Sequence, residues 1–131
     1  MKTLGIDYGR KKIGLAIADG SLSEPLRVIR YKDIKILGEK LKKIIKENNI
    51  EKVVVGISEG EMGEESKKFA ERINAETFDE TLSTHMAQEL SKEGKVGREK
   101  RKSLEDAFAA SVMLQNYLDS ASWFLIFVTL K

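Results

Sequence analysis

Short apolar runs separated by turn residues open the chain, which is the pattern of β-strands joined by tight connections. Residues 2–7 and 12–18 are two such runs, and residues 8–11 (YGRK) between them have the composition of a turn. The sequence therefore predicts a β-hairpin. A third strand is expected over residues 26–31, entered through Pro25, the only proline of the chain.

The pattern then changes to that of a helix. Between residues 34 and 49, apolar positions recur at helical spacing among lysines and glutamates, at Leu37, Leu41, Ile44 and Ile45. Residues 52–57 (KVVVGI) form a β-branched run that is typical of a buried strand. A helix followed by such a strand predicts a parallel crossover.

Four further elements are expected towards the C-terminus. They are a helix over residues 64–73, a short strand over 75–79, a helix over 83–92 and a last helix over 103–118. The resulting order, β-β-β-α-β-α-β-α-α, begins as a meander and continues as an α/β domain. No internal repeat or low-complexity segment interrupts it, so a single domain is expected.

Length and composition limit what this domain can do. The chain has 131 residues, of which 41% are hydrophobic and 34% charged, which suits one core and is too short for two. It has no cysteine, which excludes disulfides and thiolate metal sites, and a single histidine, so a metal would need oxygen ligands. The N-terminus does not resemble an export signal, and the longest apolar run, residues 123–130, is shorter than the roughly 20 residues of a membrane span. A cytoplasmic protein is expected.

The basic charge is concentrated in one segment. Residues 91–102 (SKEGKVGREKRK) contain six basic and two acidic residues, although the formal net charge of the whole chain is only +2. This segment is a natural docking place for phosphates. A solvated loop without a partner is an equally simple interpretation.

Four carboxylates stand where strands end or helices begin. Asp7 ends the first strand, Asp79 and Glu80 follow the last strand, and Asp106 opens the last helix. Ligands of open α/β sheets bind at strand ends. Taken one at a time, these acids have local explanations, because a turn aspartate, acids near a helix N-terminus and a capping box after Ser103 each favour such residues.

Together with their neighbours, these segments resemble the motifs of one family in the same order. The segments are GIDYGRKKIGLAIAD near the N-terminus, VVVGI in the central strand, DETLST after the last strand and DAFAASVMLQNYLD near the C-terminus. Over residues 3–119 the chain resembles the YqgF family, also called RuvX, whose members are regarded as Holliday junction resolvases or as nucleases of precursor 16S ribosomal RNA.

The resemblance implies a ribonuclease-H-like fold, in which a mixed five-stranded sheet, an antiparallel meander plus two parallel strands, is flanked by helices. The residues that match the family's catalytic acids are Asp7, Glu80 and Asp106, and Asp79 matches a further acid of its metal site. Such carboxylates suit Mg²⁺ or Mn²⁺, and two ions about 4 Å apart can clamp a phosphodiester for attack by water. A hydrolytic nuclease without a covalent intermediate is implied.

The partner that the resemblance implies is structured nucleic acid. The leading interpretation is processing of the 5′ end of precursor 16S ribosomal RNA in ribosome biogenesis, and the alternative is resolution of branched DNA. Symmetric cutting of a junction requires a dimer, and the sequence does not separate a monomer from a homodimer. Basic residues expected to contact phosphates are Arg10, Lys11, Lys12, Lys95, Arg98, Lys100, Arg101 and Lys102.

Two departures from the family pattern leave a diverged, non-catalytic binding protein open. Thr81 stands where the family has an arginine, and residues 58–65 (SEGEMGEE) replace a proline and an Asp-Gly-Thr type turn. The four glutamates of that segment, from Glu59 to Glu65, would repel phosphates. A lone His85 beside a helix start is more typical of a surface residue than of a site.

The nuclease domain is expected to span residues 1–119. The apolar tail, residues 120–131 (SASWFLIFVTLK), is interpreted as an added strand, with a dimer contact or a core plug as alternatives. A strand followed by Asp-x-Gly also opens the actin and sugar-kinase ATPases. Those proteins need a second phosphate loop in a second domain, and 131 residues leave no space for one.

Overall fold

The structure is a computed structural model that describes residues 1–57, 60–79 and 105–120. Residues 105–120 are helical and are named the C-terminal helix below. The other described elements are β1 (Lys2–Asp7), β2 (Lys12–Asp19), β3 (Leu22–Arg30), α1 (Ile34–Glu47), β4 (Lys52–Ile57), α2 (Glu61–Arg72) and β5 (Glu76–Asp79).

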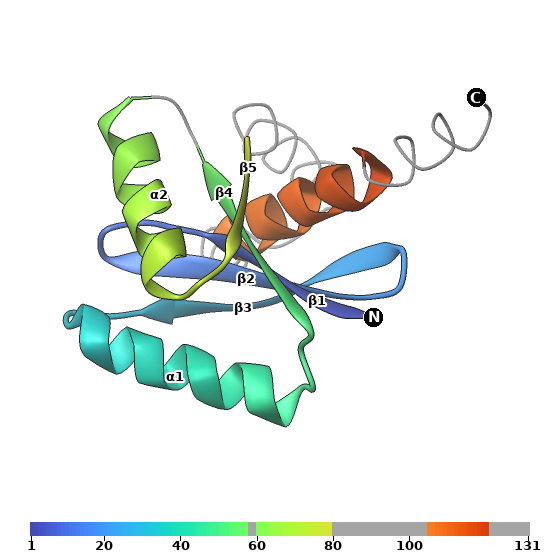
Figure 1. The fold of residues 1–131 in the computed structure, drawn as a ribbon, viewed down its shortest axis with the longest axis horizontal. Helices are drawn as coiled ribbons and strands as arrows, with labels where there is room; N and C mark the ends of the chain where they lie inside the picture. Colours follow the sequence, from blue (N-terminus) through green and yellow to red (C-terminus); the bar gives the residue numbers. More distant parts are fainter. Residues whose placement is uncertain (58–59, 80–104, 121–131) are drawn as a thin grey trace.

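Five strands form one mixed sheet in the order β3-β2-β1-β4-β5 (Figure 1). β1 pairs antiparallel with β2, and β2 with β3, whereas β1 pairs parallel with β4, and β4 with β5. This is the predicted meander with two parallel strands added, so the predicted fold class is confirmed. Because parallel strands need a crossover, α1 connects β3 to β4, and α2 connects β4 to β5.

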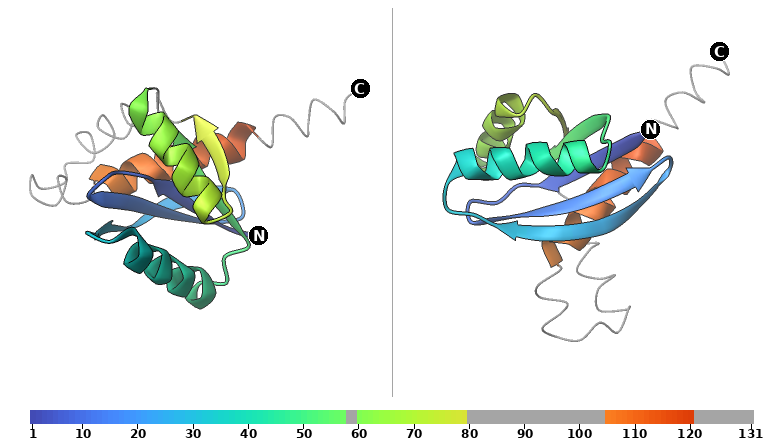
Figure 2. Two further views of the ribbon diagram at one scale, coloured as in Figure 1. Left: turned by 60° about the vertical axis from the view of Figure 1, so that its left-hand side comes forward. Right: turned by 90° about the horizontal axis from the view of Figure 1, so that it is seen from below.

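The two faces of the sheet carry different kinds of side chain. α1 and α2 cover one face, and the C-terminal helix crosses the other (Figure 2). The face under α1 and α2 is made of bulky residues, which form the main hydrophobic core with apolar side chains of those helices. The main members of this core are Leu4, Ile6, Ile13, Leu15, Val55, Leu37, Leu41 and Phe69.

Small residues form the opposite face and let the C-terminal helix approach the sheet closely. Ala16 and Ala18 of β2 pack there against Ala110 and Leu114 of the helix. At Gly14 the approach is closest, since a Cβ atom on this residue would lie 2.0 Å from the carbonyl oxygen of Asp106. The helix therefore rests on strand backbone, and only glycine fits at this crossing.

Some boundaries differ from those expected. α2 begins at Glu61 rather than at residue 64, so part of the acidic segment is the first turn of a helix, where acids are favoured by the helix dipole. β3 begins at Leu22 and contains Pro25, which a strand at the edge of the sheet tolerates. The predicted helix over 83–92, the basic segment over 91–102 and the tail after residue 120 lie outside the described residues.

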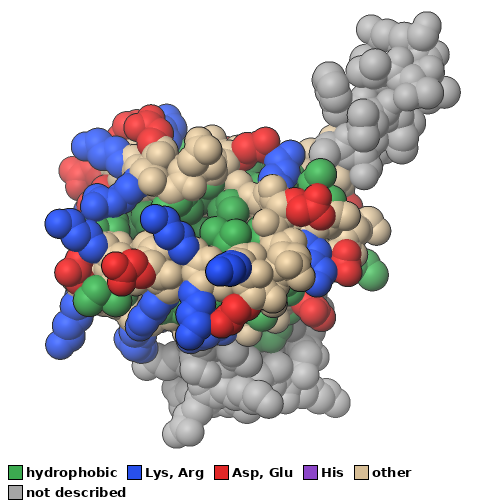
Figure 3. Space-filling view, turned by 60° about the horizontal axis from the view of Figure 1, so that its bottom comes forward, with side chains coloured by type: hydrophobic (Ala, Val, Ile, Leu, Met, Phe, Trp, Pro, Cys, Tyr) green, Lys and Arg blue, Asp and Glu red, His purple; other side chains and the backbone are tan. Residues whose placement is uncertain are grey.

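The outer surface of α1 is rich in lysine (Figure 3).

None of the helices in the described ranges combines the length and apolar character that a membrane crossing requires.

The close packing of the C-terminal helix on Gly14 can be tested by substitution. We expect Gly14→Ala to lower the free energy of unfolding by about 1–3 kcal/mol, because the obstacle is backbone that cannot rotate away. Gly38→Ala is the matched control, since nothing lies near a Cβ at that position in α1; it should be neutral or stabilise by up to about 1 kcal/mol. Urea denaturation measures both, and a Gly14→Ala protein as stable as the wild type would contradict the assigned contact.

Candidate functional site

Asp7 lies at the end of β1 between two glycines of the neighbouring strands. Its register partners are Gly14 on β2 and Gly56 on β4. Directly paired residues point to the same face of a sheet, so the side chain of Asp7 lies on the face that the C-terminal helix covers. Its two neighbours in this row carry no side chain, so the backbone of the C-terminal helix can lie over Gly14, next to the half-buried Asp7.

Asp106 comes to the same place from the C-terminal helix. Its backbone rests on Gly14, the register partner of Asp7, so both acids lie at one end of the sheet and on one face. The Asp106 carboxylate is held by Lys12, with 3.0 Å between Nζ and Oδ2. Both side chains are about one-third exposed, 39% for Lys12 and 30% for Asp106, so this ion pair remains open to a ligand.

Asp79 is not brought to these two acids. Gly56 pairs with Phe78, which places Phe78 in the same row as Asp7. Phe78 packs edge-on against Tyr117 of the C-terminal helix, with ring centroids 5.7 Å apart, so its side chain is on the face of Asp7. Because side chains alternate along a strand, Asp79 points to the opposite face.

The remaining predicted acid, Glu80, lies outside the described residues. Within residues 1–57, 60–79 and 105–120, no three Asp, Glu or His side chains form a group that could hold a metal ion. The described part of the chain thus supplies two of the three predicted catalytic acids to one place.

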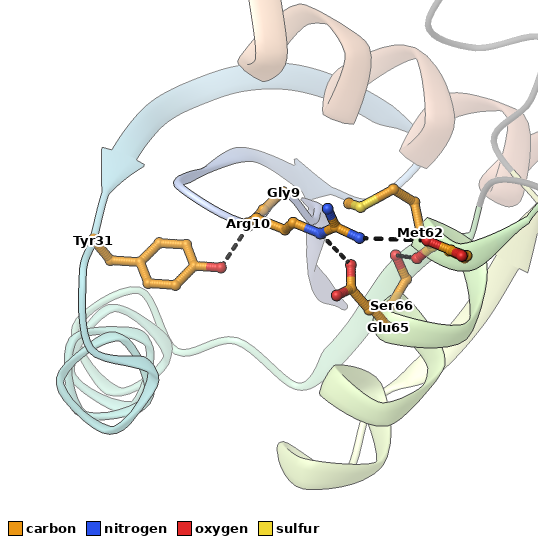
Figure 4. A network of polar contacts seen from close by, with 7 residues as sticks. Gly9, Arg10, Tyr31, Met62, Glu65 and Ser66 are labelled. Atoms are coloured by element: carbon orange, nitrogen blue, oxygen red, sulfur yellow. Dashed lines mark hydrogen bonds and ion pairs between the residues drawn. The ribbon is translucent and has the colours of Figure 1, made fainter.

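The turn after Asp7 is braced by α2 through Arg10. The Arg10 guanidinium donates from Nε to Oε2 of Glu65 at 2.8 Å and lies 3.9 Å from the Glu61 carboxylate (Figure 4). This hydrogen bond to Glu65 raises the pKa of Arg10. Two glutamates of the acidic segment thereby hold a cation of the turn.

Aromatic side chains hold the same turn from two other elements. Tyr8 stacks on Phe69 of α2, with ring centroids 4.8 Å apart. The hydroxyl of Tyr31, which follows β3, donates to the carbonyl of Gly9, as Figure 4 shows. Burial raises the pKa of Tyr31, so its hydroxyl stays protonated and remains a donor. The turn is therefore fixed before any ligand arrives.

A second polar cluster fastens the other end of the C-terminal helix. The Tyr117 hydroxyl donates to Oε2 of Glu76 at 2.6 Å, and Lys52 Nζ lies 3.3 Å from Oε1 of the same carboxylate. Lys52 also lies 5.2 Å from the centre of the Tyr117 ring. Because helix and sheet are joined at both ends, the position of Asp106 is set by contacts along the whole helix.

Comparison with known proteins shows the family of the chain. The family profile described as "RuvX: Holliday junction resolvase" matches residues 1–120. The chain belongs to the RuvX family.

Curated RuvX relatives match over almost their whole length. A protein of Oceanobacillus iheyensis named "Putative pre-16S rRNA nuclease" is 36% identical over 135 residues, covering 91% of this chain and 98% of that protein. A protein of the same name from Clostridioides difficile is 38% identical over 132 residues, covering 90% and 94%. The resemblance to the YqgF or RuvX family that the motifs suggested is confirmed.

Solved structures confirm the fold. Thermus thermophilus RuvC, solved in complex with a Holliday junction substrate, superposes with a TM-score of 0.54 at 14% identity, covering 86% of this chain and 91% of RuvC. The Fowlpox virus resolvase, in a complex with Holliday junction DNA, has a TM-score of 0.54 at 14% identity, covering 92% and 99%. At such low identity the likeness concerns the fold alone.

The basic residues predicted to contact phosphates have different surroundings in this RuvX protein. Arg10 and Lys12 are engaged in ion pairs with α2 and with Asp106, whereas Lys11 makes no ion pair with another described residue. His85, Thr81 and the remaining predicted contacts lie outside the described residues, namely Lys95, Arg98, Lys100, Arg101 and Lys102.

The sequence analysis did not predict the ion-pair partners of Arg10 and Lys12. Glu65 is 55 positions from Arg10, and no local spacing connects them. Lys12 was expected to contact phosphate, and the structure pairs it with Asp106. The one feature of the sequence that could have suggested this ion pair is the alternation of side chains, which puts Lys12 on the same face as Gly14.

The cluster around Glu76 predicts how stability depends on pH. The Tyr117 hydrogen bond, followed by the interactions with Lys52, lowers the pKa of Glu76 in the folded protein. A lowered folded pKa stabilises above the unfolded pKa, and this contribution is lost as the pH falls through the folded pKa. We therefore expect Glu76→Gln to lose less unfolding free energy than the wild type between about pH 5 and pH 3.

Tyr117→Phe should change the pH dependence in the same direction, because it removes the main cause of the shift. Denaturation curves measured across this range test both variants. Parallel stability profiles of the wild type and Glu76→Gln would show that this cluster does not couple the helix to protonation.

Proposed function

We propose that this RuvX-family protein is a divalent-metal-dependent nuclease of the cytoplasm that processes the 5′ end of precursor 16S ribosomal RNA. The observation that supports the proposal is that Asp7 and Asp106 lie on one face at one end of the sheet, with Lys12 paired to the Asp106 carboxylate. The names of the curated relatives support the choice of substrate.

The donors at this place fit Mg²⁺ or Mn²⁺. Both prefer carboxylate and water oxygens, and Asp7 and Asp106 offer carboxylates at one end of the same face of the sheet. Two like charges brought together favour a cation, and in this structure the Lys12 ammonium provides one for Asp106. Asp7 and Asp106 would hold the metal, and the family resemblance adds Glu80 as a third ligand. Bound there in a one- or two-ion arrangement, the metal would activate water and neutralise the leaving oxygen.

The chain's own residues then position the substrate. Lys12 keeps the Asp106 carboxylate oriented and can also attract the phosphate whose bond is cut. Lys11 projects from a turn fixed by Tyr8, Arg10 and Tyr31, so it meets the nucleic acid without rearrangement of the backbone. Asp79, on the opposite face, has no part in this mechanism.

Resolution of four-way DNA junctions is the second candidate, since the family profile carries that description. It would use the same acids on another substrate. Binding without cutting would instead indicate a diverged member.

Cleavage of labelled precursor leader RNA and of a four-way DNA junction tests the proposal. With Mg²⁺ or Mn²⁺ we expect cutting of the RNA, and no cutting with chelator. Asp7→Asn and Asp106→Asn should each reduce the rate at least about a hundredfold, because each removes a charged ligand of the metal.

Asp19→Asn is the matched control, because Asp19 ends β2 at the far end of the sheet, opposite Lys2, and is exposed. It should cut at the wild-type rate. Preference for the junction would replace RNA by DNA as the substrate, and undiminished cutting by Asp7→Asn would refute the assignment of the acids.

Metal binding can be measured without catalysis. Mg²⁺ or Mn²⁺ at about 100 times its Kd should stabilise the wild type by about 2.7 kcal/mol, seen as a higher unfolding midpoint. In the double variant Asp7→Asn/Asp106→Asn this stabilisation should disappear, and in Asp19→Asn it should remain. An equal shift in the double variant would place the metal elsewhere.

A further inference from the structure

A basic groove lies beside the braced turn. It encloses about 700 Å³ and runs from the turn after β1 along the end of β3 to the first half of α1. Of the eight described residues that line it, five are cationic, namely Arg10, Lys11, Arg30, Lys32 and Lys40; the others are Tyr31, Asp33 and Ile36. Figure 3 looks onto the α1 side and shows lysine and arginine side chains gathered there.

Most of these cations have no acidic partner in the part of the chain that the structure describes. Among the described residues, the ion pairs of the groove involve Arg10 alone, and Lys11, Arg30, Lys32 and Lys40 form none. The one acid among the described lining residues, Asp33, caps α1 by accepting a hydrogen bond from the Lys35 amide at 2.8 Å. An anion in the groove would therefore meet four cations whose charge no described acid neutralises.

The groove adjoins the proposed active site through the sheet. Arg30 is the register partner of Lys12, the residue that holds Asp106. The Tyr31 amide donates to the Lys11 carbonyl at 3.0 Å, so the wall from β3 and the wall from the turn are joined. A strand whose phosphate lies at Asp7 and Asp106 can therefore continue past Lys11 into the groove.

We propose that this groove binds the sugar-phosphate backbone of the nucleic acid strand beyond the bond that is cut. The proposal rests on the proposed function for its substrate, and it adds Arg30, Lys32 and Lys40 as binding residues. Successive cations along the groove match the repeating charge of a phosphodiester chain.

The two uncharged side chains of the groove fit the same ligand. Ile36 is 51% exposed although it is large and apolar, and it lies in the groove with Tyr31. Apolar and aromatic surfaces beside cations contact sugars and bases of a strand without reading its sequence. The groove should accordingly bind nucleic acid with little sequence preference.

Binding measured in chelator, where no cutting occurs, tests the groove. Fluorescence anisotropy with labelled leader RNA, and with a DNA strand of the same sequence, is recorded for the wild type and for Lys32→Gln/Lys40→Gln across a series of salt concentrations. We expect the double variant to bind about tenfold more weakly and its salt slope to fall by about 1 for each lysine removed.

The control is Lys35→Gln/Lys42→Gln, which removes the same charge from the other flank of α1, outside the groove. It should bind and respond to salt much like the wild type. Equal losses of affinity in both double variants would show that net charge alone matters, and would overturn the proposal. Unchanged binding by Lys32→Gln/Lys40→Gln would overturn it as well. Weakening with RNA alone or with DNA alone identifies which strand the groove accepts.

Cleavage separates this inference from the proposed function. With Mg²⁺ the groove variant should have a raised KM and an unchanged kcat, because the acids are intact. If Asp7→Asn cuts normally while the groove variant still binds weakly, the proposed catalytic site fails and the groove stands. If Asp7→Asn is inactive and the groove variant binds like the wild type, the proposed catalytic site stands and the groove proposal fails.

Discussion

The contact between the C-terminal helix and the backbone of β2 at Gly14 is the constraint on which the site depends. No side chain separates the two elements there, so the Asp106 backbone lies directly over the register partner of Asp7. Two acids that are 99 positions apart in the chain are thereby joined through a single residue. A larger residue at this position would separate them as well as weaken the packing.

This contact is possible because the two faces of the sheet carry side chains of different size. Bulky residues under α1 and α2 supply most of the hydrophobic stabilisation, which frees the opposite face to be built from glycine and alanine. On that face the cluster of Tyr117, Glu76 and Lys52 adds polar contacts that hold the far end of the helix. Stability and positioning are thus provided by different layers of one domain.

The sequence predicted the fold better than the surroundings of the site. Strands such as Lys52–Ile57 were found at their true bounds, because β-branched runs between turns are a local signal. The start of α2 was missed, since Gly60 and the glutamates after it have the composition of a loop. The pairings of Arg10 with Glu65 and of Lys12 with Asp106 depend on how distant elements pack, and no local pattern encodes them.

Because Arg10 already donates from Nε to Glu65 and lies near Glu61, a phosphate that approaches it competes with these carboxylates. In the free protein Glu61 and Glu65 pair with the guanidinium, and this pairing lowers the affinity of Arg10 for another anion. Binding at this residue becomes an exchange of one anion for another, in which a single weak anion gains little over the resident glutamates. A polyanion that engages neighbouring cations at the same time can win that exchange, so the turn would favour a nucleic acid strand over free phosphate.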